Sequence, residues 1–347
     1  MATFHSLNIS NIRTLTSQAV EITFEVPAEL ASQYQFDHGQ FLMLRHEIDG
    51  EQVERAYSIC RAPYERSLSV AVKAVEGGVF STFATSRLKA GDSVFVSTPG
   101  GTFTNRLDSS KKKQYLLVAA GSGITPIISI LKMVLASETQ SQCSLVYANK
   151  SEQQTMFLEE LNSLQQRYGE RFSLQMVYSQ SGEEGAVKRI SDDSLRLCLG
   201  EHYHQQFDEV FLCGPEQMTL GLRDALLASN VESEKIHLEL FSAAKDLSAD
   251  SDGIQHCQVS MVIDGQTIEF NYEDSTRSLL DVALDFDDEL PYGCQNGSCG
   301  SCQAKVLKGQ IDMEINFALS ADEVEQGYAL MCQARPKSPK VEISYDE

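Results

Sequence analysis

Four cysteines near the C-terminal end of this 347-residue sequence constrain its folding more than any other feature. In the stretch "PYGCQNGSCGSCQAK", residues 291–305, four residues separate Cys294 from Cys299, two separate Cys299 from Cys302, and Cys332 follows after a long gap. Glycines and serines lie among the first three cysteines, and small residues let a backbone wrap closely around a bound group. These thiols predict a metal centre around which the C-terminal segment folds.

The spacing of the cysteines indicates which centre they hold. A Cys-x4-Cys-x2-Cys run with a distant fourth cysteine is the pattern of plant-type ferredoxins, where four thiolates hold a [2Fe-2S] cluster. The alternative is a structural zinc site, which usually has two Cys-x-x-Cys pairs or one pair with two histidines. Only one such pair is present, and no histidine follows His256. The predicted cluster ligands are Cys294, Cys299, Cys302 and Cys332.

The composition argues against several function classes. A formal net charge of -21 leaves no basic footprint for nucleic acid. The N-terminal residues lack the basic and apolar regions of an export signal. The apolar stretch 115–136 could pass for a membrane span, but glycines, Pro126 and Lys132 interrupt it, which favours a strand, a turn and a helix. We expect a cytoplasmic protein with no nucleic-acid or membrane partner.

Changes of texture along the chain predict a multidomain fold. Residues 1–110 carry short alternating apolar stretches with one helical interruption near 80–88, which is typical of a small antiparallel β-barrel or β-sandwich. Residues 111–242 alternate apolar strands with helical patterns, which predicts an α/β domain with a parallel sheet. These helical patterns cover residues 127–137, 155–168 and 216–228.

The remaining chain divides into a linker and a third domain. Residues 243–256 are polar and small, without an apolar period, which suits a linker. Residues 257–347 contain their own strand patterns and a helical pattern near 278–286, and so form a compact domain around the cysteines.

One strand-to-helix turn has the composition of a phosphate-binding site. In "LLVAAGSGITPIISILK", residues 116–132, Gly121 and Gly123 would let the backbone approach a pyrophosphate, and the following helix offers free N–H groups. Pro126 fits the first helical turn but takes the place of the third glycine in the common dinucleotide fingerprint. An ordinary strand-to-helix turn stays open as an alternative at this point.

Two stretches of the barrel segment have the composition of a second nucleotide site. "RAYSIC", residues 55–60, combines a guanidinium that suits phosphate with an aromatic ring that suits a flat heterocycle, although an ordinary half-buried strand explains it as well. "EGGVFSTF", residues 76–83, supplies two glycines and then Ser81 and Thr82, either of which could cap a helix and help to bind pyrophosphate.

In this order the motifs resemble the ferredoxin–NADP reductase family. The resemblance spans nearly the whole chain and implies an antiparallel β-barrel that binds FAD, an α/β domain that binds NADPH, and an α+β ferredoxin domain of the β-grasp type. It also implies that Arg55 pairs with the flavin pyrophosphate, Tyr57 stacks on the isoalloxazine and Ser58 lies near its N5. Cys213, in "FLCGPEQM", would lie beside the nicotinamide, and Phe241 near the flavin.

The same resemblance supplies the expected site residues. Ser58 and Cys213 are the expected catalytic residues. The residues expected to bind the flavin or the nucleotide are Arg55, Ala56, Tyr57, Ser58, Val72, Lys73, Gly77, Gly78, Ser81, Thr82, Gly121, Gly123, Thr125, Pro126, Asn149, Lys150, Arg189, Gly214, Pro215 and Phe241.

Basic residues near the expected nucleotide site favour NADPH over NADH. The family reads the 2'-phosphate with a basic residue after an asparagine, and this chain has Asn149 followed by Lys150, where relatives commonly carry arginine. A lysine meets a phosphate as a point charge but lacks the bidentate fork. Arg189 matches a second basic position, although Lys188 replaces a usual glycine there. NADH stays open as the alternative donor.

The implied function is electron transfer. A hydride carries two electrons and the cluster accepts one, and a flavin can handle both. Stretches such as "ERAYSICRAPY", "AAGSGITPI" and "GYALMCQA" are similar to the reductase components of phenylacetyl-CoA epoxidase systems, which serve a di-iron oxygenase. Alternatives are a reductase for a fatty-acid desaturase or a hybrid-cluster protein, and a redox-sensing adaptor.

Residues 257–347 hold 17 Asp and Glu against 6 Lys and Arg, so an oxygenase component could dock on this acidic domain.

Overall fold

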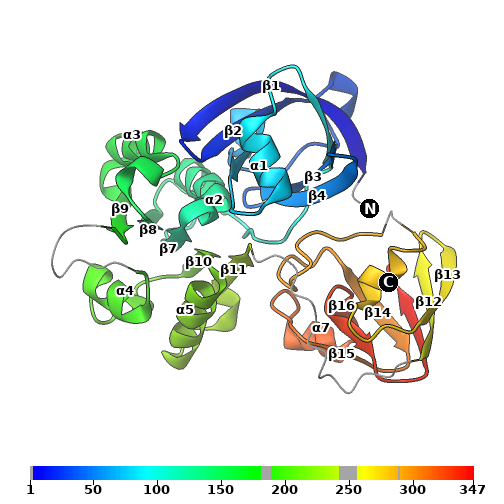
Figure 1. Ribbon diagram of the computed structural model, residues 1–347. Coiled ribbons are helices and arrows are strands. Elements are labelled where there is room, and N and C mark those ends of the chain that lie inside the picture. Colours follow the sequence, from blue (N-terminus) through cyan, green and yellow to red (C-terminus); the bar gives the residue numbers. More distant parts are fainter. Residues whose placement is uncertain (1–2, 181–188, 242–255, 288–289) are drawn as a thin grey trace. The chain divides into compact units, whose positions relative to one another are not determined.

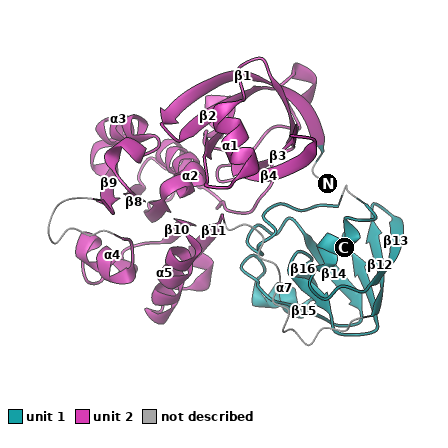
Figure 2. Ribbon diagram, viewed as in Figure 1, with its two compact units in different colours: residues 1–3, 242–347 teal, residues 4–241 magenta. Residues whose placement is uncertain are grey.

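The structure, a computed structural model, describes residues 3–180, 189–241, 256–287 and 290–347. It divides into two compact units, residues 4–241 and residues 1–3 with 242–347 (Figure 2). The predicted linker at 243–256 lies outside the described residues apart from His256. No helix in the described ranges is long and apolar enough to cross a membrane.

The first half of the 4–241 unit is a closed antiparallel β-barrel, as the alternating strands predict (Figure 1). Its strands follow the order β4-β3-β6-β1-β2-β5, and a bridge between Ile59 and Val70 closes the barrel between the two ends of this order. Helix α1, Val79–Ser86, lies between β5 and β6 in the chain. The strands are β1 Phe4–Thr16, β2 Ala19–Glu25, β3 Phe41–Ile48, β4 Glu51–Ser58, β5 Leu68–Lys73 and β6 Ser93–Ser97.

Local sequence explains how the barrel strands pair. β3 and β4 form a hairpin whose two turn residues, Asp49 and Gly50, have φ of 54° and 90°. Asp-Gly is a preferred pair for such a turn because both positions need positive φ and its twist matches that of the strands. The alternate residues of β6, Val94 and Val96, are buried, so one face of the ribbon fills the barrel.

The second half of the unit is a parallel five-stranded sheet of order β11-β10-β7-β8-β9, as predicted. Helices α2 and α3 pack on one face of this sheet, and α4 and α5 on the other. Both faces are covered, which explains why β7 reads as an unbroken apolar run. The elements are β7 Gln114–Ala120, α2 Ile124–Ser137, β8 Gln142–Asn149, α3 Leu158–Tyr168, β9 Phe172–Tyr178, α4 Asp192–Leu199, β10 Glu209–Gly214, α5 Glu216–Ala228 and β11 Ile236–Leu240.

The other unit is an α+β domain built on a mixed five-stranded sheet of order β13-β12-β18-β14-β16. The first and last strands of the domain, β12 and β18, run parallel at its centre, which is the β-grasp arrangement. Between α6 and β14, the described residues 284–287 and 290–302 form turns and bends, and the cysteine loop lies among them. The elements are β12 Cys257–Ile263, β13 Gln266–Tyr272, α6 Leu279–Ala283, β14 Gln303–Lys308, β15 Ile311–Met313, α7 Ala321–Glu325, β16 Tyr328–Leu330, β17 Ala334–Pro336 and β18 Lys340–Ser344.

Helices α3 and α6 are shorter than predicted, α2 begins at Ile124 rather than 127, and α4 has no counterpart among the predicted ranges. Helix α3 begins at Leu158 rather than 155, because Phe157 has a left-handed φ of 60° that ends any earlier helical turn. Helix α6 covers less than the predicted 278–286, since the chain after Ala283 continues as single turns. Helix α4 was not predicted; Ser191 caps it, accepting a hydrogen bond from the Ser194 N–H.

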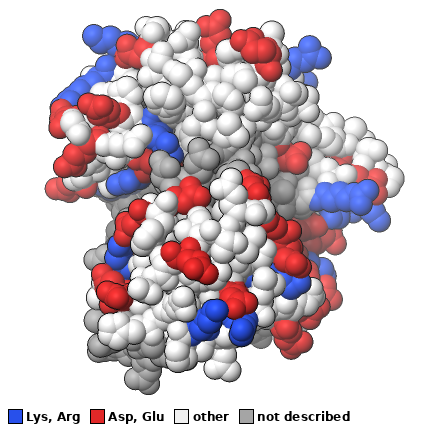
Figure 3. Space-filling view, turned by 90° about the vertical axis from the view of Figure 1, so that its right-hand side faces the viewer, with Lys and Arg blue, Asp and Glu red and all other residues white. Residues whose placement is uncertain are grey.

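Part of the predicted acidic surface has a structural role within its own domain. Asp281 closes the capping box of α6 with Ser278, and Asp285 forms an ion pair with Arg277. Asp288 and Glu289 lie outside the described residues. On the face drawn in Figure 3, acidic and basic side chains are interspersed rather than gathered into one continuous acidic patch.

Candidate functional site

The predicted phosphate-binding turn lies at the carboxyl end of the parallel sheet. β7 passes through a 3-10 turn at Gly121–Gly123 directly into α2, and its neighbours β8 and β10 lie on opposite sides of it. In parallel sheets, ligands bind at such a topological switch point. A Cβ added to Gly123 would lie 2.2 Å from the Cys213 carbonyl oxygen, so only glycine lets the turn approach β10 this closely. Thr125 fixes the turn by donating to the Ser122 carbonyl at 3.0 Å.

The carboxyl end of β10 completes this edge of the sheet. Gly214 is the last residue of the strand, and a Cβ there would lie 2.7 Å from the Met218 Cε and 3.0 Å from the Ala120 Cβ. Pro215 is exposed and precedes the first residue of α5. Pro126 is buried in the first turn of α2. The backbone of two helix N-termini therefore faces one open edge, where free N–H groups suit a dinucleotide pyrophosphate.

The predicted flavin motif lies at the end of the barrel strand β4. Arg55 and Ala56 are exposed, and the Arg55 guanidinium donates to the Glu54 carbonyl at 2.6 Å. The Tyr57 ring is half-buried, and its centroid is 5.5 Å from that of Phe80. Burial raises the pKa of Tyr57, against the lowering effect of the Arg55 charge, so the ring stays neutral. An exposed guanidinium beside a half-buried aromatic ring fits a flavin dinucleotide.

The helix that follows the two glycines offers a further backbone N-terminus. Gly78 precedes the first residue of α1, and a Cβ there would lie 2.4 Å from the Ser81 Oγ. The buried Ser81 hydroxyl accepts from the Val75 N–H at 3.2 Å, which ties the glycine loop to the helix. Gly77 has a φ of 74°, and Thr82 is exposed. Val72 lies in the barrel core, so only its backbone could meet a ligand.

Ser58 and Cys213 converge on a carboxylate that the sequence analysis missed. The buried Ser58 hydroxyl donates to Glu239 Oε2 at 3.1 Å, and Glu239 on β11 is in register with Cys213 on β10. Burial, and secondarily the Glu239 charge, raise the pKa of Cys213 well above its ordinary value, so it is a thiol. The signal was available in "HLELF", where a carboxylate that proves to be buried interrupts an apolar strand.

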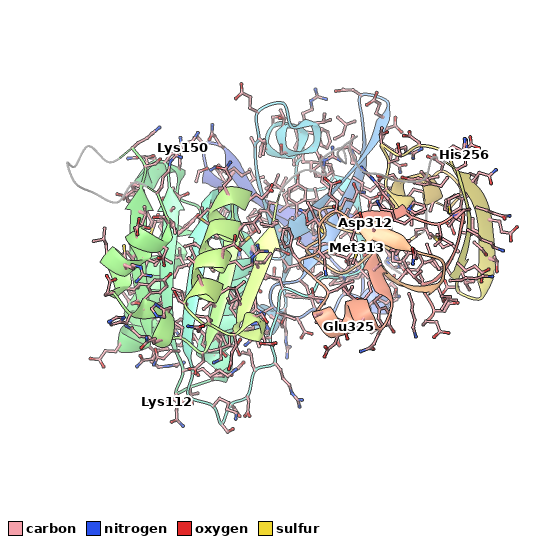
Figure 4. The ribbon with its side chains drawn as sticks, turned by 90° about the horizontal axis from the view of Figure 1, so that it is seen from below. Lys112, Lys150, His256, Asp312, Met313 and Glu325 are labelled. Atoms are coloured by element: carbon pink, nitrogen blue, oxygen red, sulfur yellow. The ribbon has the colours of Figure 1, made fainter. Side chains whose placement is uncertain are left out.

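Two lysines bring positive charge to the same edge of the sheet. The Lys73 ammonium at the end of β5 is 3.9 Å from the position of a Cβ on Gly121. Burial and then the charge of Lys150 lower the pKa of Lys73. Figure 4 shows Lys150 at one end of the parallel sheet and Lys112 at the other. The open edge thus combines glycine backbone with two cations, which suits a phosphorylated ligand.

Three further residues were predicted to bind the nucleotide or the flavin. Asn149 is buried at the end of β8, directly before Lys150. Arg189 is exposed. It directly follows residues 181–188, which include Lys188 and lie outside the described residues. Phe241 directly follows β11, and 42% of its surface is exposed, which leaves the ring open to a ligand.

The four cysteines form two pairs rather than one tetrahedral set. The Cys294 N–H lies 3.3 Å from the Cys299 Sγ, and the Cys332 N–H lies 3.5 Å from the Cys302 Sγ. Cys299 lowers the pKa of Cys294 through a hydrogen bond between their side chains. Among the described residues, no group of three or more His, Cys, Asp or Glu side chains is arranged to hold a single metal ion. Two thiolates for each of two irons is what a [2Fe-2S] cluster needs, so the residues fit the cluster better than zinc.

Backbone N–H groups of the loop are directed at the sulfurs. Those of Asn296 and Ser298 lie 3.5 Å and 3.4 Å from the Cys294 Sγ. Gly297 has a φ of 78°, and a Cβ there would lie 2.9 Å from the Ile315 carbonyl oxygen. Glycine at this position therefore lets the loop lie close to its neighbour while its amides face the cluster ligands.

Comparison with protein families divides the chain in the same way. Residues 6–105 match the oxidoreductase FAD-binding domain, residues 117–224 the oxidoreductase NAD-binding domain, and residues 261–337 the 2Fe-2S iron-sulfur cluster binding domain. The chain therefore uses FAD and a [2Fe-2S] cluster, with NAD(P)H as the electron donor.

Full-length relatives and solved structures have the same three parts. The chain is 38% identical to one of the proteins that make up the 1,2-phenylacetyl-CoA epoxidase of Escherichia coli K12, over 100% of this chain and 99% of that one. It is 32% identical to the ferredoxin reductase component of 3-ketosteroid-9-alpha-monooxygenase from Mycobacterium tuberculosis H37Rv, over 98% and 96%. Phthalate dioxygenase reductase superposes with a TM-score of 0.60 at 25% identity, covering 98% of each chain.

Proposed function

The chain belongs to the NAD(P)H-dependent oxidoreductases that pass electrons through FAD and a [2Fe-2S] ferredoxin domain to an oxygenase, and we propose that its oxygenase acts on phenylacetyl-CoA. The observation that carries this proposal is the 38% identity, over the whole length, to a component of the 1,2-phenylacetyl-CoA epoxidase of Escherichia coli. In this proposal the chain supplies electrons for phenylacetate catabolism, and the oxygenase proteins carry out the substrate chemistry.

A second acceptor has specific support. The ferredoxin reductase component of 3-ketosteroid-9-alpha-monooxygenase matches 98% of the chain at 32% identity. The higher identity of 38% favours the epoxidase, although both relatives match the chain along its three domains. Both oxygenases are therefore candidate acceptors for a coupled-turnover experiment.

The chain's own residues position the donor and the flavin. Bound FAD can take a hydride as an electron pair and release single electrons, which is what a one-electron cluster requires. We assign Ser58 and Cys213 to the place where the flavin and nicotinamide rings meet, because their side chains converge on Glu239 from two different domains. Glu239 orients the Ser58 hydroxyl, and the neutral Cys213 thiol adds no charge beside a nicotinamide.

The arrangement of lysines supports NADPH as the donor. Lys150 follows Asn149 at the open end of β8, and its charge acts on Lys73 across the glycine turn. We assign Lys150 to the 2'-phosphate and Lys73 to the nucleotide pyrophosphate. A point charge stabilises a phosphate without the bidentate geometry of arginine, so we expect a preference for NADPH over NADH rather than an absolute requirement.

The acceptor is identified by coupled turnover. Purified protein loaded with FAD and iron is mixed with the oxygenase proteins of a phenylacetyl-CoA epoxidase or with the oxygenase of the ketosteroid system, and NADPH consumption is measured with and without each substrate. We expect phenylacetyl-CoA to stimulate consumption, with an oxygenated acyl-CoA formed in proportion. Stimulation only by the ketosteroid system would assign the chain to that acceptor instead. Rapid reduction of ferricyanide with no response to either oxygenase would contradict both assignments.

A further inference from the structure

Both pairs of cysteine thiols have polar groups beside their sulfurs, and the Cys299 sulfur lies 3.4 Å from the Ser301 hydroxyl oxygen. The Cys294 sulfur is approached by two backbone N–H groups, from Asn296 and Ser298. The Cys302 sulfur is approached by the Cys332 N–H. The Cys332 sulfur is approached by a side chain, the Gln333 amide, at 3.9 Å. The environment of the Cys302–Cys332 pair therefore depends in part on a side chain that can be substituted without altering the backbone.

Gln333 is held in place for this contact. The residue is only 3% exposed, and its Nε2 also donates to the Gln295 carbonyl at 3.0 Å. Gln295 lies in the cysteine loop, where it has a left-handed φ of 54°. One amide group thus links the cysteine loop to the segment that carries Cys332, and its second N–H remains for a sulfur.

Tyr345 brings a second donor to the same pair. Its hydroxyl is buried and has no hydrogen-bond partner in the part of the chain that the structure describes. In the antiparallel pairing of β14 with β18, Lys305 lies opposite Ser344. By continuation of this register the next residue, Tyr345, lies on the side of Ala304, which is two residues from Cys302. The ring packs against the core cluster that contains Cys302 and Cys332.

A buried hydroxyl without a partner needs an explanation, since burying a donor that makes no hydrogen bond destabilises the fold. A phenolic hydroxyl carries its proton at neutral pH, so Tyr345 can donate a hydrogen bond. Sulfur atoms of the bound cluster or of its thiolates are acceptors available on that side.

We propose that Gln333 and Tyr345 donate hydrogen bonds to the sulfurs at the Cys302–Cys332 end of the cluster and thereby raise its reduction potential. The reduced cluster carries one more negative charge than the oxidised one. A hydrogen bond to sulfur stabilises negative charge and so favours the reduced state. The two side chains act on the electron affinity of the cluster, not on hydride transfer at the flavin.

The experiment measures the potential of the cluster in the full-length loaded protein. Samples of wild type, Y345F, Q333M and the double variant are poised at a series of potentials, and the EPR signal of the reduced cluster gives each midpoint. Y345F removes one oxygen atom from a residue that needs no repacking, so it keeps the fold. Q333M keeps the length of the side chain and loses both N–H groups. Y328F is the matched control, because Tyr328 is a half-buried tyrosine of the same domain on β16.

We expect both single variants to have a more negative midpoint than wild type, the double variant to shift further, and Y328F to stay at the wild-type value. Iron and sulfide content equal to wild type shows that the cluster is intact, and the rate of flavin reduction by NADPH stays unchanged. A wild-type midpoint in Y345F overturns the proposal for Tyr345, and one in loaded Q333M overturns it for Gln333. An equal shift in Y328F overturns it for both.

Discussion

At the scale of single residues, the contact of Ser58 with Glu239 connects the barrel to the nucleotide sheet. The two residues are 181 positions apart, and their side chains are 3.1 Å apart. A hydrogen bond of this kind contributes about 0.5–1.5 kcal/mol, which corresponds to a factor of roughly two to ten in rate. The orientation of the Ser58 hydroxyl is therefore within reach of a kinetic test.

We predict that Ser58→Ala slows reduction of the flavin by NADPH by about three- to tenfold, the loss of one oriented hydroxyl. Anaerobic stopped-flow absorbance at the flavin band measures this rate. The variant should still bind FAD in a one-to-one ratio and keep the cluster spectrum of wild type. A Ser58→Ala protein with the wild-type rate of flavin reduction would show that the hydroxyl does not take part.

The second prediction at this scale concerns Lys150. Lys150→Ala should raise the KM for NADPH by about tenfold, as expected for the loss of a charged hydrogen bond of ~1.5 kcal/mol, and should leave the KM for NADH unchanged. Lys112→Ala is the matched control, because Lys112 lies at the other end of the sheet (Figure 4). Equal changes in both KM values would remove Lys150 from recognition of the 2'-phosphate.

The sequence predicts some of these residues and not others, for a physical reason. Three of the predicted cluster ligands follow one another at short spacings and Cys332 completes the pattern after a long gap, while the glycines stand out because a close approach excludes every side chain. Glu239 could not be assigned from its strand alone, since its partner Ser58 belongs to a different domain and only the fold brings them together. Tyr345 is a similar case, because an unpaired hydroxyl is visible only in three dimensions.

At the scale of secondary-structure elements, a partly buried network of charges connects the barrel to helices α2 and α3. Lys132 of α2 is only 3% exposed and forms ion pairs with Glu65 at 3.1 Å and with Glu160 of α3. Three cations and three carboxylates balance one another across the network. Its members are Arg13, Arg61, Lys132, Glu21, Glu65 and Glu160.

We predict that Lys132→Met lowers the free energy of unfolding by about 3 kcal/mol, because it removes the buried cation and leaves three carboxylates facing only two arginines. Urea denaturation followed by circular dichroism measures the change. Arg87→Met is the control, since Arg87 pairs with Asp49 on the exposed surface, where ion pairs contribute little. Similar losses in the two variants would contradict a special role for the partly buried network.

The same network predicts a dependence of stability on pH. Burial alone would raise the pKa of Glu65, but the Ala62 N–H and the Lys132 charge lower it below its ordinary 4.5. A carboxyl with a depressed folded-state pKa stabilises the fold above its unfolded value, and this contribution is lost as the pH falls through the folded value. Wild type should therefore lose stability below about pH 4.5 more steeply than Lys132→Met. Urea midpoints across this range measure the slopes, and parallel slopes would contradict the assignment to Glu65.

Elements were easier to predict from the sequence where the pattern was long and periodic. The apolar run of β7 indicated a strand that is buried on both faces. The alternation in β2 and β5 indicated strands of an antiparallel sheet, because burial on one face leaves a period of two residues. The eight-residue α4 has no such run, and its start depends on the Ser191 cap. The end of α6 depends on turns that only the folded domain stabilises.

At the scale of the whole molecule, three domains arranged in sequence order match three stages of electron transfer. We expect the acidic ferredoxin domain to be the one that meets the acceptor. Asp287→Lys should slow electron transfer to the oxygenase, more at low than at high salt, because Asp287 is partly exposed and charges at a surface steer association. Ferricyanide reduction should stay at the wild-type rate. Glu325→Lys, on α7 of the same domain, is the charge-matched control. An unaltered oxygenase rate in Asp287→Lys would place the docking surface elsewhere.

The central claim is that electrons from NADPH pass through the flavin to the cluster held by Cys294, Cys299, Cys302 and Cys332. The most direct measurement is rapid-freeze EPR of the loaded protein after anaerobic mixing with NADPH. We predict that the signal of the reduced cluster follows flavin reduction and that it is absent in Cys332→Ala, whose flavin is still reduced. A flavin that is reduced while the intact cluster stays oxidised would contradict this claim.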